Sequence, residues 1–414
     1  MRQSELFVKT LREDPKDEVS ANAKLLVRGG FVDKLMAGVY SFLPLGLRVL
    51  KNIEGIVREE MEGIGGKELL MPALHPLENY AKTGRENIDV LFHTESSTGN
   101  KMVLGQSHEE VIVPLVKKFI FSYRDFPLAV YQIQTKFRNE LRAKSGIFRG
   151  REFLMKDLYS FHLTEDDFAR YYEEVKKAYM RVFQRVGIGA TTHLTRASGG
   201  TFSRYSDEFQ TLTDAGEDTI HLCEKCKVAV NDEIWGETKK CPSCGNIKVK
   251  TARSIEVGNI FPLKTRFAEA FDLKVKDERG IDALVTMGCY GLGISRLMGA
   301  IAETHHDERG IIWPEAVAPF RAHLVEVESK NAKVKSAAEK VYKNLVAKRV
   351  EVLYDDREDT TAGEKFADAD LIGIPFRVVV SEKTVEKKGV EVKRRGEERA
   401  MIMTVQELLK KMRG

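Results

Sequence analysis

The sequence predicts an α+β protein with three parts: a sheet flanked by helices, a small cysteine-rich knuckle, and a C-terminal α/β domain. Three observations predict this fold. Two long amphipathic helices bracket a pair of alternating strands, two Cys-x-x-Cys pairs stand in the middle of the chain, and strands alternate with helices beyond Phe320. At 414 residues, the chain is long enough for about three domains.

Composition excludes several classes of protein. Hydrophobic residues make up 43% of the chain and charged residues 31%, which excludes wholesale disorder and fibrous repeats. No apolar run approaches the roughly 20 residues of a membrane span, and the N-terminal segment lacks a secretory apolar region. The net charge of +4 permits a nucleic-acid partner without requiring one. We therefore expect a cytoplasmic protein.

The first predicted helix covers residues 47–64 and is followed by a short strand. Gly65 and Gly66 end the helix, and Lys67–Met71 predicts a strand that Pro72 ends. The apolar positions at helical spacing are Leu47, Leu50, Ile53, Val57, Met61 and Ile64.

A second amphipathic helix follows Thr164. This threonine is the predicted N-cap, with Asp167 at the spacing of a capping box, and Gly187 is the predicted end. Its apolar stripe consists of Phe168, Tyr171, Tyr172, Val175, Tyr179, Val182 and Val186.

Two polar strands lie between these helices. Residues 131–140 alternate so that every long polar side chain lies on one face, which by itself favours a solvated sheet surface. The return strand, residues 149–159, favours a site for a flat, charged ligand instead, because it adds arginines, an acid and aromatic rings to the hairpin. Its odd-numbered face carries Arg149, Arg151, Phe153, Met155, Asp157 and Tyr159.

A third strand, Ala283–Met287, runs into the glycine-rich segment Gly288–Gly293. The helix after these glycines carries Arg296 in its first turn. A Rossmann fingerprint and a Walker A loop are both absent, so an ATP site must use another scheme.

The C-terminal region reads as a compact α/β domain beyond the linker Trp313–Pro319. We expect strands at 321–328, Val350–Tyr354 and Phe376–Val380, helices at 331–348, Lys365–Ile372 and Val405–Met412, and a charged hairpin over 384–403.

Four of the five cysteines form two Cys-x-x-Cys pairs, Cys223/Cys226 and Cys241/Cys244. This spacing in a chain expected in a reducing compartment favours a structural zinc ribbon, since four thiolates leave no open coordination position. The alternative is a degenerate knuckle without metal.

The fifth cysteine, Cys289, stands alone. It is either a nucleophile with His305 or His306 as base, or a buried thiol that packs beside a glycine turn, and the second interpretation is favoured. His162 and His221 are expected to be ordinary strand-end histidines rather than ligands.

Together these elements resemble class II aminoacyl-tRNA synthetases, and specifically bacterial-type prolyl-tRNA synthetases. The helix and strand that end at Pro72 resemble motif 1, which builds the dimer interface of that family. Phe137–Glu140 with Arg149, Phe153 and Asp157 resembles motif 2, and Gly291–Arg296 resembles motif 3. The strings specific to the prolyl enzymes are Tyr131–Phe137, Arg151–Asp157, Thr286–Tyr290 and Leu371–Pro375.

The resemblance implies a homodimer with an antiparallel catalytic sheet. It implies a first catalytic part at 1–215, a zinc-ribbon-like insertion at 216–254, a second catalytic part at 255–318 and an anticodon-binding domain at 319–414.

It also implies ATP-dependent activation of L-proline and transfer to the 3′ end of tRNA(Pro). The substrate carboxylate attacks the α-phosphate, so the protein must hold two anions together. Arg138 and Arg296 are the implied catalytic residues. The implied nucleotide site consists of Arg138 at the α-phosphate, Glu140 at the adenine amino group, Phe153 beneath the ring, Arg149 and Arg296 at the γ-phosphate, Gly293, and Glu256 as a ligand of Mg²⁺.

The implied proline site includes the loop Ser107–Glu109. Glu109 pairs with the cationic imino group, and Ser107 stands where the family usually has Thr. A second departure is Asn259, where the family usually has His. The remaining residues of this site are Arg138, Met155, Asp157, Tyr159 and Cys289.

A larger departure is the absence of an inserted editing domain. Only about forty residues separate Gly216 from Ile255, and they hold the four paired cysteines. Alanine is smaller than proline, and a missing methylene gives only ~1–3 kcal/mol of discrimination. We expect alanine activation without correction in cis, which would leave correction to a separate trans-editing deacylase.

Contacts with tRNA leave two interpretations open. Arg142, Lys144 and Arg151 either contact the acceptor end or form a solvated basic loop. Asp355–Arg357 resembles the anticodon-binding module, and Lys383–Arg399 is expected to be a solvated hairpin that could touch RNA phosphates.

Two alternative functions remain. A non-catalytic synthetase paralogue with a regulatory or binding role would be expected to lose the phosphate-binding arginines, which this chain keeps. A sister synthetase for threonine or serine would differ in the pocket around Glu109 and Asp157.

Overall fold

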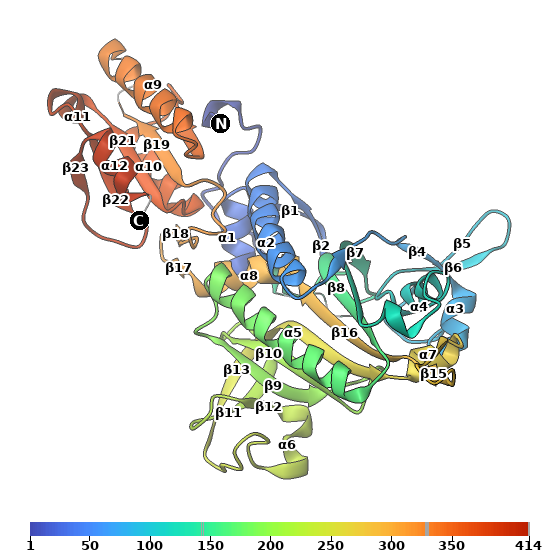
Figure 1. The fold of residues 1–414 in the computed structure, drawn as a ribbon. Coiled ribbons are helices and arrows are strands. Elements are labelled where there is room, and N and C mark those ends of the chain that lie inside the picture. The colour runs from blue at the N-terminus through green and yellow to red at the C-terminus, as the bar shows by residue number, and fades with distance from the viewer. Residues whose placement is uncertain (142, 144, 328–330, 413–414) are drawn as a thin grey trace. The chain divides into compact units, whose positions relative to one another are not determined.

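A computed structural model describes residues 1–141, 143, 145–327 and 331–412 (Figure 1). The chain forms two compact units. The core unit comprises Lys34–Tyr40 and Ile53–Ala300, and the terminal unit comprises Met1–Asp33, Ser41–Asn52 and Ile301–Gly414. Four elements contain residues of both units: β1 (Val32–Met36), β2 (Val39–Phe42), α2 (Pro44–Glu62) and α8 (Ile294–Thr304). Arg142 and Lys144, expected in a basic loop, and residue 328 of the expected strand 321–328 lie outside the described residues.

The core unit is built on a large sheet. Its helices are α3 (Leu77–Thr83), α4 (Glu109–Lys117), α5 (Glu165–Val186), α6 (Asp232–Thr238) and α7 (Arg266–Ala270), with 3₁₀ turns at Tyr123–Asp125 and Gly146–Phe148. Its strands are β3 (Lys67–Glu68), β4 (Leu74–Pro76), β5 (Phe92–Glu95), β6 (Lys101–Leu104), β7 (Leu128–Phe137), β8 (Glu152–His162), β9 (Thr192–Ser198), β10 (Tyr205–Leu212), β11 (Asp218–Cys223), β12 (Ala229–Asn231), β13 (Val249–Lys264), β14 (Lys274–Lys276), β15 (Asp282–Leu284) and β16 (Thr286–Gly293).

Nine strands form the main sheet in the order β10-β9-β12-β11-β13-β16-β8-β7-β3, and β10 also pairs with β13. The pairings are antiparallel except those of β9 with β12 and of β3 with β7. Helix α5 packs against β8 and β16 (Figure 1). This arrangement confirms the expected class II sheet flanked by helices.

The polar hairpin is confirmed, although its strands begin and end differently from the prediction. β7 ends at Phe137, so Arg138 and Glu140 lie beyond the strand, and β8 begins at Glu152, so Arg149 precedes it. The polar face of β7 is not a solvated surface, because Gln132 and Lys136 are fully buried.

The glycine-rich segment is a strand and not a turn. Gly288–Gly293 belongs to β16, and Cys289 therefore lies within the sheet. Close packing excludes a side chain at Gly288, since a Cβ there would lie 2.3 Å from the Tyr290 hydroxyl oxygen and 2.9 Å from the Phe168 ring.

Capping residues in the sequence correctly predicted where the long helix α5 begins and ends. Thr164 Oγ1 accepts from the Asp167 backbone N–H at 3.2 Å, and Gly187 ends α5 at φ 99°. The Asp167 carboxylate does not close a capping box, because it pairs with His162 at 2.6 Å instead. The strand expected at Lys67–Met71 is only two residues long.

The terminal unit contains a five-stranded sheet in the order β20-β19-β21-β22-β23. Leu324 and Val378 face α9 and α12, whereas Val325 and Val379 face α10, so helices cover both faces. The sequence did not reveal α11, which occupies the first residues of the expected hairpin 384–403, so the hairpin begins only at Val390. The elements are a 3₁₀ turn at Gln3–Glu5, α1 (Ala21–Arg28), β17 (His306–Asp307), β18 (Gly310–Ile311), β19 (Ala322–Glu326), α9 (Ala332–Ala347), β20 (Val352–Asp355), α10 (Ala362–Ile372), β21 (Phe376–Val380), α11 (Glu382–Glu386), β22 (Val390–Arg394), β23 (Met401–Met403) and α12 (Val405–Lys411).

None of the helices in the described part of the chain combines the length and apolarity needed to cross a membrane.

Candidate active site

A cavity of about 560 Å³ lies on the main sheet of the core unit. It brings together residues that are far apart in the sequence, from the loop before α4, the segment after β7, strands β8, β13 and β16, and the start of α8. The expected site residues on its wall are Ser107, Arg138, Glu140, Met155, Asp157, Glu256, Cys289, Gly293 and Arg296.

Two guanidinium groups define one end of the cavity. Arg138 and Arg296 both line it, and Arg138 Nε is buried without a hydrogen-bond partner among the described residues. Burial and then the charge of Arg296 lower the pKa of Arg138. Arg296 is fixed by the Phe148 and Glu256 carbonyl oxygens, both at 2.8 Å. Two neighbouring cations held in this way form a preorganised site for an anion.

The other expected nucleotide residues lie around this end. The Phe153 ring lies 5.2 Å from the Arg138 guanidinium carbon. Arg149 does not line the cavity, and its side chain is 46% exposed. It pairs with Glu140 at 3.2 Å and with Glu217 at 2.6 Å. The structure therefore brings Arg138 and Arg296 together at the cavity. The third arginine, Arg149, lies outside the cavity wall and pairs with Glu140.

A buried acidic cluster adjoins Ser107 on the cavity wall, although Glu109 itself does not line the cavity. Glu109 is fully buried, its Oε2 accepts a short hydrogen bond from Ser107 Oγ, and its Oε1 has no partner among the described residues. Arg85 donates to Glu110 at 2.8 Å and lies 3.6 Å from Glu109. Arg85 also packs over the Phe202 ring at 4.4 Å. Two carboxyl groups thus share one buried guanidinium near Ser107, and burial raises the pKa of Glu110.

Asp157 is the centre of a buried network. Lys136 lies 2.7 Å from its Oδ1, and Oδ2 accepts from Gln132 at 2.9 Å and Tyr159 at 2.8 Å. Burial, the largest single influence, would raise the pKa of Asp157, but Lys136 and the other groups around the carboxylate together lower it. Burial, together with Lys136, lowers the pKa of His108 to about 3, so this histidine stays neutral beside the pair. Asp157 therefore adds no net charge to the acidic end.

Cys289 packs in the sheet. It is 5% exposed, and burial followed by the charge of Glu109 raises the pKa of its thiol well above the usual range. A protonated, buried thiol favours packing over nucleophilic chemistry. His162 and His221 are paired with Asp167 and Asp232, both as ordinary histidine–carboxylate contacts.

A β-bulge brings Glu256 and Asn259 to the same wall. Phe209 pairs with Gly258 and Gln210 with Glu256, so Val257 is an extra residue in β13. The bulge shifts the alternation of side chains, and Glu256 and Asn259 both line the cavity. Behind them, burial and then Glu256 raise the pKa of Glu208 to about 8.

The four paired cysteines meet in one cluster. Their Sγ atoms all lie within 4.8 Å of one another, with Cys223 and Cys244 3.6 Å apart and Cys226 and Cys241 3.4 Å apart. Tetrahedral thiolate coordination at roughly 2.3 Å needs sulfur atoms at about this separation. Two similar backbone turns hold the pairs, since Lys227 N donates to Cys223 O and Gly245 N to Cys241 O. The cluster therefore fits a zinc ion.

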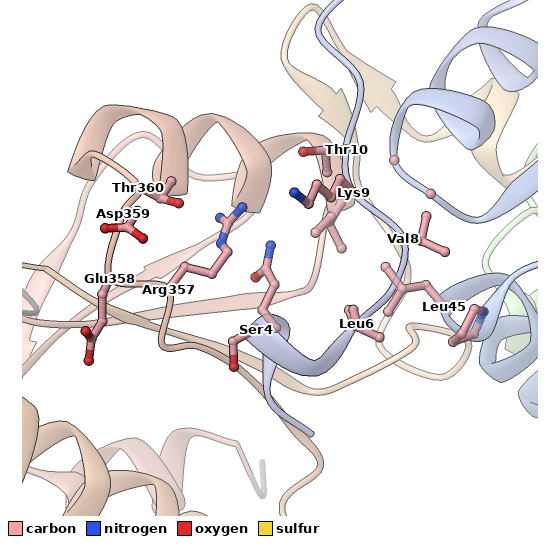
Figure 2. Close-up of a pocket in the computed structure, with 15 residues that line it drawn as sticks. Ser4, Leu6, Val8, Lys9, Thr10, Leu45, Arg357, Glu358, Asp359 and Thr360 are labelled. Atoms are coloured by element: carbon pink, nitrogen blue, oxygen red, sulfur yellow. The ribbon is translucent and has the colours of Figure 1, made fainter.

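The terminal unit has a separate cavity of about 400 Å³ (Figure 2). The N-terminal segment, with Leu6 and Lys9, forms one side, and residues 357–360 form another. Arg357 makes a bidentate contact with Asp355 and also pairs with Asp368 at 2.9 Å. The turn that resembles the anticodon module therefore borders this cavity.

Sequence reasoning missed three buried residues near the active site: Arg85, Lys136 and Glu208. Lys136 lies on the polar face of the alternating strand 131–140, and its charge suggested that this face is solvated, so its burial was not expected. Arg85 and Glu208 gave no signal, because their partners are distant in the sequence.

Comparison with known proteins agrees with this architecture. Residues 92–305 match the family model "tRNA synthetase class II core domain (G, H, P, S and T)", and residues 316–414 match "Anticodon binding domain". The proline--tRNA ligase of Anaplasma phagocytophilum is 38% identical over 429 residues and covers all of both chains. That of Dehalococcoides mccartyi is 32% identical over 562 aligned residues, covering 100% of this chain and 98% of its own.

A solved structure has the same fold. The prolyl-tRNA synthetase of Cryptosporidium parvum, complexed with L-proline and AMP, superposes with a TM-score of 0.77 at 18% identity, covering 95% of this chain and 76% of that one. The matched core is that of a class II aminoacyl-tRNA synthetase. Within that class, the chain belongs to the proline--tRNA ligase family.

The Lys136–Asp157 pair gives a stability prediction. Lys136→Met leaves a buried carboxylate without its counter-ion, and we expect it to lower the free energy of unfolding by about 3–5 kcal/mol. The double variant K136M/D157N removes both charges and should recover most of this loss. Urea unfolding measures both, with exposed Lys101→Met as the control. Equal destabilisation by the single and double variants would contradict the ion-pair explanation.

Proposed function

We propose that this chain is a proline--tRNA ligase that activates L-proline with ATP and transfers it to tRNA(Pro). One observation carries the proposal: a single cavity is lined by two guanidinium groups and by Ser107, which holds the buried carboxylate of Glu109, whose other oxygen has no partner among the described residues. A triphosphate and a cationic amino acid have the complementary charges. The retained arginines argue against a non-catalytic paralogue, and the names of the relatives argue against a threonine or serine enzyme.

The chain's own residues would perform the first step by orientation and charge. Arg138 would hold the α-phosphate and the proline carboxylate together, while Arg296 would hold the far end of the triphosphate. Glu140 would accept from the adenine amino group and Phe153 would stack on its ring. Arg149 pairs with Glu140 in this structure and would contact the γ-phosphate after a change of side-chain rotamer. The nucleophile is already ionised, so no general base is needed.

Magnesium fits this wall, because Glu256 offers a carboxylate next to the anion site. When bound, Mg²⁺ neutralises phosphate charge, and Glu256 is the residue that would hold it. Gly293 would let the phosphates approach the backbone.

Proline would occupy the acidic end. Glu109, the buried carboxylate with an unpartnered oxygen, would pair with the imino cation, and Ser107 would hold that carboxylate in place. Met155, Tyr159 and Cys289 would shape the pocket around the ring. Asp157 would act mainly through its network with Lys136.

The terminal unit would bind the anticodon arm of tRNA, and Lys9 on the wall of the cavity in Figure 2 would contact RNA, whereas Arg357 is held by Asp355 and Asp368. We expect Arg151 near the acceptor end, a homodimer built through the motif 1 helix, and a cytoplasmic location. The division at residues 215, 254 and 318 remains a prediction.

Amino-acid-dependent pyrophosphate exchange tests the function. Across a panel of amino acids, proline should give the highest kcat/KM, and Arg138→Lys should lower it at least about 100-fold because lysine cannot make a bidentate contact. Arg151→Lys is the control and should retain exchange. Absence of exchange with every amino acid would favour the paralogue, and a preference for threonine or serine would favour the sister enzyme.

The short insertion predicts mischarging. The alignment with the Dehalococcoides enzyme spans 562 positions against 414 residues here, so at least 148 positions have no counterpart in this chain. We expect alanine to be activated and alanyl-tRNA(Pro) to persist in the presence of the purified protein, leaving hydrolysis to a separate deacylase. Deacylation of preformed alanyl-tRNA(Pro) is the measurement, and rapid hydrolysis by this chain would refute the prediction.

The cysteine cluster predicts one structural zinc ion per chain. Metal analysis of undenatured protein should return close to one equivalent, and Cys226→Ser should lose the ion and lower thermal stability. Cys289→Ser, outside the cluster, should keep full zinc content. Less than about half an equivalent in the wild-type protein would favour the degenerate knuckle.

A further inference from the structure

A row of residues crosses the main sheet at the cavity floor. Strand pairing places Asp157 beside Gly291, Gly291 beside Asn259, and Asn259 beside Glu208. The first three line the cavity, whereas Glu208 lies one strand further out and is 7% exposed. None of the roles described above uses Glu208 or Asn259.

Glu208 determines the orientation of the Asn259 amide. Asn259 Nδ2 donates to Glu208 Oε1 at 3.2 Å, while Oε2 accepts from Gln210 at 2.9 Å and from Asn231 at 3.3 Å. Both oxygens of Glu208 thus accept from amide groups, and the NH₂ end of Asn259 is the end that faces Glu208. Burial raises the pKa of Glu208 to about 8, so this orientation is selected most strongly where the group is ionised, because a carboxylate only accepts hydrogen bonds. The oxygen end of Asn259 is therefore directed away from Glu208.

That oxygen lacks a partner. Asn259 is 9% exposed, and its Oδ1 is buried without a hydrogen-bond partner among the described residues. A buried polar atom left in this state costs free energy, and buried acceptors in folded proteins are nearly always satisfied. Because Asn259 lines the cavity, a bound substrate is the natural source of the missing donor.

The chemistry of the substrates limits which donor it is. Carboxylate and phosphate oxygens carry no proton to donate at neutral pH, and the imino cation is matched by Glu109 at the acidic end. Asn259 stands between that end, marked by Cys289 and Phe261, and the anion end, marked by Glu256 and Arg296. The donors that remain are the second N–H of the imino cation and the ribose hydroxyls, and the position of Asn259 between the two ends favours the ribose hydroxyls.

We propose, on the basis of the proposed function, that Asn259 Oδ1 accepts a hydrogen bond from a ribose hydroxyl, and that Glu208 is the positioning residue that holds the amide in this orientation. Two substrates bring such a hydroxyl to the reaction centre: ATP and the 3′-terminal nucleotide of tRNA.

Two assays distinguish these sources, with Asn259→Leu as the variant that removes the acceptor at similar volume. Pyrophosphate exchange with ATP, 2′-deoxyATP and 3′-deoxyATP tests the nucleotide. Single-turnover transfer of proline to tRNA tests the tRNA. One tRNA keeps both hydroxyls of its terminal ribose, and the other keeps only the hydroxyl that accepts proline.

In the assay whose substrate donates to Asn259, the rate or kcat/KM of the wild-type protein should fall about fivefold when the hydroxyl is removed. With the complete substrate, Asn259→Leu should already have a rate or kcat/KM near that lower level, and removal of the hydroxyl should lower it little further. Asn259→Ala replaces it if the leucine variant does not fold. Undiminished discrimination by the variant in both assays overturns the proposal. A wild-type protein without proline-dependent exchange would instead contradict the proposed function.

The role of Glu208 has its own test. Glu208→Gln no longer selects one amide orientation and should lose part of the discrimination in the same assay. The reciprocal double variant E208Q/N259D restores a donor–acceptor pair and keeps an acceptor oxygen at position 259, so it should recover most of the loss.

Asn231→Leu is the matched control, because it removes another contact of Glu208 without touching the cavity. Its discrimination should be unchanged. Thermal melting of each variant separates folding from positioning: a double variant that melts like the wild type but recovers no discrimination overturns the role of Glu208.

Discussion

The cavity depends on the central strand β16, which has glycines at positions where the two neighbouring strands carry side chains. Gly291 and Gly293 of β16 line the cavity, between Asp157 on one adjacent strand and Asn259 on the other. On the opposite face the same strand is closely packed against aromatic rings at Gly288. The substrates would therefore occupy space above a bare backbone, and the side chains that select them come from the strands on either side. The division of the cavity into an acidic and a basic end follows from this arrangement.

Local patterns in the sequence were enough to predict the elements and much of the site. The boundaries of α5 followed from Thr164 and Gly187, and the alternation in β7 and β8 identified the hairpin on which the site is built. Recognition of the arginine motifs then placed Arg138 and Arg296 at one anion site.

What the sequence could not give depends on pairing between distant segments. The charge of Lys136 suggested a surface residue, but its ammonium group contacts Asp157, which lies opposite Gln132 in the strand register and not opposite Lys136. Arg85 and Glu208 act on Glu110 and Asn259 through contacts that no local spacing encodes. The position of Arg149 also differs from a simple three-arginine grip, because the acid next to it competes for its guanidinium group.

The extra residue at Val257 has a genetic consequence. Glu256 and Asn259 lie on one face, although they are three positions apart, because Val257 is accommodated as an extra residue. Loss of the Val257 codon would restore strict alternation and would keep both residues on that face, since Gly258 alone would then separate them. This position is therefore expected to tolerate the loss of one codon, whereas the gain of one codon between the two residues would require the strand to accommodate a second extra residue.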